Sequence, residues 1–149
     1  EFRLAAEYTL SRQLNAEIEA QLGSRDPERY ARAREIVAEA EADGFRLESE
    51  ASAARLGAWL AAATEDFRRA PSAATVGALL AVLRLAKDLR LDLPLDAAQE
   101  GIFALLQDPL ARSALTAIGT PLDDLRDRLG LATGPLPASQ APLTTAPED

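Results

Sequence analysis

Three acidic residues at four-residue spacing form the strongest candidate for chemistry in this sequence. Glu35, Glu39 and Asp43 follow one another at i, i+4 and i+8, with Glu41 between them. On a helix this spacing stacks the carboxylates on one face, where they could share a proton or a hard cation. Carboxylate-bridged metal sites in helical bundles usually add a histidine, and the chain has none. We therefore interpret the row as a solvated face and predict no metal ion or other cofactor.

Catalysis by two carboxylates stays chemically open, because glycoside hydrolysis needs only such a pair, roughly 5–9 Å apart. The pair must converge in a cleft, whereas nearly every Asp and Glu here falls at a cap, in a first turn or on an outer helix face. The absence of Cys, Met and His excludes thiolate and imidazole catalysis and the usual zinc ligands. Phosphate-binding glycine loops, HExxH and GxSxG are also absent. We predict no catalytic residue in this segment.

Two aromatic residues are candidates for an interaction surface. Trp59 is the only tryptophan, and its indole could stack on a sugar ring or on a partner helix. Tyr8 could present its hydroxyl to a ligand. Packing into the core is the commoner use of both side chains, and we expect it here.

A short basic row, Arg25, Arg29 and Arg32, could bind an acidic partner. Glu28 and Glu35 are interleaved with it, so pairing along the exposed helix surface is the simpler explanation.

The net charge of −8 argues against nucleic acid and anionic lipid as partners, and no apolar run is long enough to span a membrane. A chain without cysteine fits a reducing compartment, so we expect a soluble, cytoplasmic protein. The chain has no initiator Met and opens inside a helical pattern. We expect it to be a segment of a longer protein.

Helical periodicity covers most of the chain, and no stretch alternates as a strand does. The first helix, for example, shows apolar residues every four positions from Ala6 to Leu22. We predict an all-α bundle, residues 1–131, with five main helices at about 2–22, 27–43, 49–70, 73–90 and from 94 or 96, and two short ones at about 109–118 and 121–129. Predicted core positions include Leu14, Ile36, Leu56, Phe67, Leu83, Ile102 and Phe103.

Capping residues predict where several helices begin. Asp26, Asp108 and Thr120 each precede a proline, an order typical of a cap followed by the first helical residue. Ser72 can cap the fourth helix, and Asp96 with Gln99 three residues later suggests a capping box for the fifth. Residues 132–149 are rich in Pro, Ala and Thr without periodicity, so we expect a disordered tail or linker that buries little surface.

Two stretches resemble a known family. They are LAAEYTLSRQL at 4–14 and LAKDLRLDLPLDAAQ at 85–99. The first is similar to the A-E-Y-x-L-N-x-x-L helix of a helical C-terminal domain of uncharacterised function. The second is similar to that domain's L-A-x-x-L-G-L-x-L-D-L-W-x-A-Q-N run. That domain follows the catalytic barrel in proteins related to family-57 glycoside hydrolases. The resemblance covers roughly residues 4–110.

The match has departures. Ser11 stands where the pattern has Asn, Arg90 where it has Gly, and Glu100 where it has the final Asn. Pro94 and Asp96 stand where the pattern has Asp and Trp, whereas the Gln of the pattern is retained as Gln99. The resemblance implies a non-catalytic accessory domain that contacts the catalytic domain of the same polypeptide, in a carbohydrate-active enzyme. We carry Tyr8, Trp59 and Gln99 forward as candidate interaction residues. The alternatives are a helical adaptor that binds another protein, and an enzyme of a kind that the motifs do not reveal.

Overall fold

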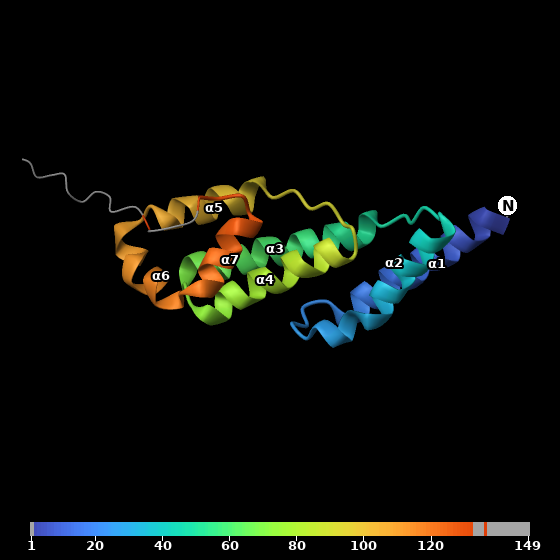
Figure 1. Cartoon of the computed structure of the whole chain (residues 1–149), viewed down its shortest axis with the longest axis horizontal. Helices are drawn as coiled ribbons and strands as arrows, with labels where there is room; N and C mark the ends of the chain where they lie inside the picture. The colour runs from blue at the N-terminus through green and yellow to red at the C-terminus, as the bar shows by residue number, and fades with distance from the viewer. Residues whose placement is uncertain (1, 133–135, 137–149) are drawn as a thin grey trace, which may run out of the picture. The chain divides into compact units, whose positions relative to one another are not determined.

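A computed structural model describes residues 2–132 and residue 136. Within this part of the chain the secondary structure is entirely helical, which confirms the predicted all-α class with five main and two short helices (Figure 1). The α-helices are α1 (Phe2–Gln21), α2 (Ala31–Asp43), α3 (Glu50–Arg69), α4 (Ala73–Asp88), α5 (Asp96–Leu106), α6 (Arg112–Ile118) and α7 (Thr120–Arg128), and two 3-10 helices are η1 (Pro27–Tyr30) and η2 (Pro109–Ala111).

The chain divides into two compact units that share two helices. Unit 1 comprises Glu1–Leu60 and Ala81–Pro94, and unit 2 comprises Ala61–Leu80 and Leu95–Asp149. Each of α3 and α4 therefore contributes one part to each unit. The predicted organisation as one bundle, 1–131, stays a prediction, and most of the predicted tail lies outside the described residues.

Unit 1 is built on the antiparallel pair of α1 and α2, which lie side by side (Figure 1). The turn between them is held by the buried residue Tyr30. Its hydroxyl donates to the backbone carbonyl of Ser24 at 2.7 Å, and the same hydroxyl lies 2.8 Å from the backbone carbonyl of Gln21. Burial raises the pKa of Tyr30 above its ordinary value. The buried apolar residues of α1 and α2 are Leu10, Leu14, Ile18, Ala33, Ile36, Val37 and Ala40.

The predicted stripe of α1 is therefore buried only in its middle. Ala6 is half-buried and Leu22 is exposed, because Leu22 follows the last residue of the helix in the turn to Gly23. Gly23 has a positive φ of 89°, which glycine adopts without the steric cost that a side chain brings.

Unit 2 packs the second part of α3 and the first part of α4 with α5, α6 and α7. Its larger buried side chains are Phe67, Val76, Leu79, Leu80, Ile102, Leu105, Leu106, Leu115, Ile118, Leu122, Leu125 and Leu129. Phe103 was predicted for this core and is 53% exposed. The buried face of α5 runs through Ile102 and Leu105, three residues apart, so the intervening Phe103 points away from it.

Three of the five predicted caps are confirmed. Asp26 accepts from Glu28 N at 3.0 Å, Asp108 accepts from Leu110 N at 2.9 Å, and Ser72 accepts from Thr75 N at 3.1 Å. In the first two cases the capped element is a 3-10 turn, so the following α-helix begins at residue 31 or 112.

The other two predicted caps are wrong. Asp96 is the first residue of α5 rather than its cap, where its negative charge still favours the positive end of the helix dipole. Thr120 likewise lies inside α7, and Gly119 occupies the cap position with a φ of 79°.

Candidate interaction surface on the first helix

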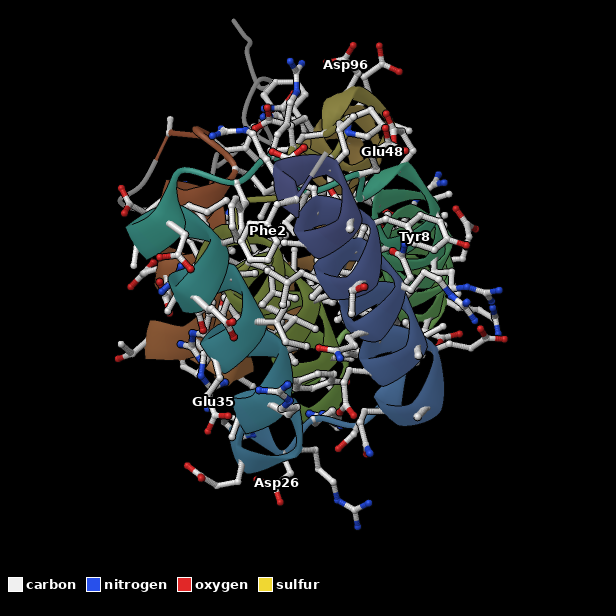
Figure 2. The ribbon with its side chains drawn as sticks, turned by 90° about the vertical axis from the view of Figure 1, so that its right-hand side faces the viewer. Phe2, Tyr8, Asp26, Glu35, Glu48 and Asp96 are labelled. Atoms are coloured by element: carbon white, nitrogen blue, oxygen red, sulfur yellow. The ribbon has the colours of Figure 1, made fainter. Side chains whose placement is uncertain are left out.

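The acidic row on α2 is a solvated face, as its pattern indicates. Glu35, Glu39 and Asp43 are exposed, and Glu35 pairs with Arg32 at 3.3 Å. Figure 2 shows Glu35 on the side of α2 away from α1. No cluster of acidic side chains suited to a metal ion occurs among the described residues.

A hollow of about 280 Å³ opens beside the N-terminal half of α1, within unit 1. We call it the α1 groove. One wall is α1 and the other is the segment 45–49 that joins α2 to α3 and has no helix or strand of its own. The groove is lined by Leu4, Glu7, Tyr8, Ser11, Arg46 and Glu48.

Side chains of α1 hold the far wall of the groove in place. The Glu7 carboxylate accepts the Arg46 backbone N–H at 2.7 Å, and the Ser11 hydroxyl accepts that of Glu48 at 2.9 Å. The amide of Asn15 donates to the Glu48 carbonyl at 3.3 Å. Backbone groups outside helices need partners of this kind, so α1 fixes the path of a segment that lies about 40 positions further along the chain.

Two of the exposed residues that line the groove are apolar, beside the exposed and charged Arg46 and Glu48. Leu4 is 68% exposed and Tyr8 is 63% exposed, and their spacing of four places both on one helix face. The Arg12 guanidinium lies 5.8 Å from the centre of the Tyr8 ring. Phe2, also exposed, lies on the other side of α1 from Tyr8 (Figure 2). Leu4 and Tyr8 therefore form a compact patch that water contacts in the isolated chain.

The groove also brings two carboxylates, Glu7 and Glu48, to one hollow, which raises the question of catalysis. The Glu7 carboxylate is 3.3 Å from the Arg3 guanidinium, and Glu48 is exposed. A glycosidase general acid instead sits in an apolar, water-poor pocket that keeps it protonated. The arrangement suits recognition of polar groups better than proton transfer.

The three candidate residues have different surroundings. Tyr8 lies in the groove, and the expectation that its ring is buried is wrong. The buried face of α1 begins at Leu10, and two helical positions separate the two side chains by about 200° around the axis. Trp59 is half-buried in α3 and does not line the groove.

Gln99 belongs to unit 2 and has a structural role there. Its side-chain amide donates to the Leu129 carbonyl at 2.8 Å, which satisfies a backbone group at the end of α7 that the helix leaves without a partner. The basic row is also accounted for at Arg32, which pairs with Glu35 and donates to Gln13 at 3.3 Å.

Of the groove residues, only Tyr8 was predicted from the sequence, and Leu4, Glu7, Ser11, Arg46 and Glu48 were missed. The only local signal was the pair Leu4 and Tyr8 at helical spacing, two positions out of phase with the core stripe.

Comparison with known proteins gives no match: no protein-family model, no curated sequence and no solved structure matches the chain. None of the helices in the described residues is long and apolar enough to cross a membrane.

Proposed function

We propose that this chain is a non-catalytic accessory domain that docks against another polypeptide through the α1 groove. The observation that carries the proposal is the exposure of Leu4 and Tyr8 together at the mouth of a hollow whose walls are held by side-chain hydrogen bonds. Exposed apolar side chains gathered beside a polar rim are typical of protein interaction sites. Tyrosine contributes a large contact area there at low cost in conformational entropy.

The chemistry around the patch indicates what the partner presents. Glu7 and Glu48 stand beside Leu4 and Tyr8, with Arg46 across the groove. A partner that inserts one apolar side chain and places a hydrogen-bond donor or a basic group next to it would satisfy both parts of the surface.

The class of partner comes from the resemblance to the helical domain of family-57-related proteins. One local feature supports that resemblance: Arg90 has a φ of 59°, the left-handed conformation that glycine adopts most readily, at the position where the family's run has Gly. On this proposal the groove faces the catalytic barrel of the same polypeptide, and the catalytic carboxylates belong to that barrel.

The test is a double substitution, Leu4→Ser with Tyr8→Ser, made in the full natural polypeptide. Exposed α2 residues provide the matched control, Ala38→Ser with Ala42→Ser. We expect the groove variant to lower the melting temperature or solubility of the full polypeptide while leaving the melting of the isolated 149-residue chain unchanged. Equal behaviour of the groove and control variants in the full polypeptide would refute docking through α1.

A further inference from the structure

A second hollow, of about 490 Å³, lies on unit 2 against α6 and α7. Its floor includes Leu115 of α6 and Leu122 of α7, both almost fully buried. Arg112 and Arg126 contribute to its walls. Neither the resemblance nor the α1 groove assigns any role to this hollow.

Leu136 also lines this hollow, although it lies beyond the last helix in the segment that we expected to bury little surface. Its side chain is half-buried, and its backbone carbonyl lies 3.5 Å from Nη2 of Arg112, which donates to it. Leu136 is thus one described residue of the segment 132–149 that does contact unit 2, while the expectation for the segment as a whole stays a prediction.

The sequence around Leu136 favours an extended conformation. Proline follows it at 137 and precedes it at 135, and a residue before proline is sterically biased away from the helical region. The two prolines also reduce the number of conformations that the free segment can adopt, so less entropy is lost when the leucine docks.

From the two leucines on its floor, the arginine donor and the position of Leu136 on its wall, we propose that the α6–α7 hollow is a docking site for an extended leucine segment, and that Leu136 of this chain takes up one side of it. The leucine side chain packs against the apolar part of a lining that also includes Thr116, Thr120 and Asp123, and the guanidinium of Arg112 donates to the backbone carbonyl. The site thus recognises one side chain and the main chain next to it, as extended peptides are commonly recognised.

Two leucines of the C-terminal region allow a matched test in the full chain. Leu136 and Leu143 each follow a proline, so Leu136→Asp can be compared with Leu143→Asp. We expect Leu136→Asp to lower the melting temperature by about 2–4 °C and to speed hydrogen exchange of α6 and α7 amides several-fold, with α1 and α2 unchanged. Leu143→Asp should do neither. Equal effects of the two substitutions, or none from either, would overturn the assignment.

The occupant can also be supplied separately. A chain that ends at residue 132 lacks Leu136, and a peptide of residues 132–140 carries it. We expect this peptide, at millimolar concentration, to shift NMR signals of α6 and α7 in the shortened chain and to leave the full chain unaffected, because a tethered segment competes at a high effective concentration. The same peptide with Leu136→Ala should not bind. Equal binding to both chains would mean that Leu136 does not dock at the place where the peptide binds, and would overturn the proposal.

Discussion

The Arg90 guanidinium lies 2.9 Å from the Glu41 carboxylate, and it does so from a backbone with a φ of 59°. A side chain in this region costs about 1 kcal/mol relative to glycine, whereas an exposed ion pair contributes only about 0.2–1 kcal/mol. Both side chains are more than half exposed. The two effects are thus similar in size, and the ion pair offsets strain at the end of α4.

Substitution at this position separates the two effects. Arg90→Gly loses the pair and relieves the strain, so its free energy of unfolding should stay within about 0.5 kcal/mol of the natural chain. Arg90→Ala loses the pair and keeps the strain, so it should be about 1 kcal/mol less stable than the glycine variant. Urea unfolding measures both. If the alanine variant were as stable as the glycine variant, residue 90 would not be left-handed in solution.

Ser11 should matter more than an ordinary helix serine, because its buried hydroxyl accepts the Glu48 backbone N–H. Ser11→Ala removes that acceptor and should cost about 1–2 kcal/mol of unfolding free energy. Ser113→Ala, at an exposed position on α6, is the control and should change stability by less than about 0.5 kcal/mol. Equal costs for the two substitutions would show that α1 does not hold segment 45–49.

The core prediction for α4 can be tested at Leu83, which is 9% exposed. Leu83→Ala should cost about 2–5 kcal/mol through lost apolar burial and the cavity that is left. Leu110→Ala, at a leucine that is 93% exposed, provides the control and should cost little. A change below about 1 kcal/mol at Leu83 would place the wrong face of α4 in the core.

Tyr30 gives the stability a defined dependence on alkaline pH. Burial raises its pKa in the folded chain above the ordinary 10.0, so the unfolded chain loses the phenolic proton first. The folded state then holds more protons, and the free energy of unfolding falls as the pH rises from about 10 through the folded pKa.

Tyr30→Phe should remove this decline, at a constant cost of about 1 kcal/mol for the lost hydrogen bond. Urea titrations between pH 8 and 11 measure it, with Tyr8→Phe as the control. An unchanged decline in Tyr30→Phe would assign the titration to another group.

The absence of a buried, apolar carboxyl site in the α1 groove leads to a prediction about activity. The isolated chain should release no sugar from soluble α-glucans such as amylose or glycogen, because Glu7 is held beside Arg3 and Glu48 is open to water. A reducing-sugar assay over hours would detect slow turnover. Turnover that is lost in Glu7→Gln or Glu48→Gln would make the groove an active site and overturn the accessory proposal.

The sequence predicted the helices well, because their signals are local. Apolar residues at helical spacing of three or four predicted α1 to α5, and Asp-Pro pairs marked the starts of η1 and η2. The boundaries shifted where Asp26 and Asp108 bond the backbone two residues later, since this tight bond favours a 3-10 turn before the α-helix begins.

The groove was harder to predict because it depends on contacts between distant positions. Ser11 of α1 accepts a hydrogen bond from Glu48, which lies in a segment without regular structure, and nothing in the pattern around residue 48 indicates this partner. Periodicity identified the buried face of α1 but not how much of its length is covered, so Tyr8 was assigned to the core although it lies on another face.

The claim that the α1 groove is a docking surface is tested most directly by photo-crosslinking from Tyr8. A photoreactive phenylalanine analogue replaces Tyr8 in the full natural polypeptide, with the same analogue at Ala38 as the control, and mass spectrometry identifies the crosslinked peptides. Our account predicts crosslinks from position 8, and not from position 38, to the catalytic domain of the same polypeptide. Crosslinks from position 8 to a separate protein would instead identify an adaptor, and no crosslink from position 8 beyond those seen from position 38 would contradict docking through this groove.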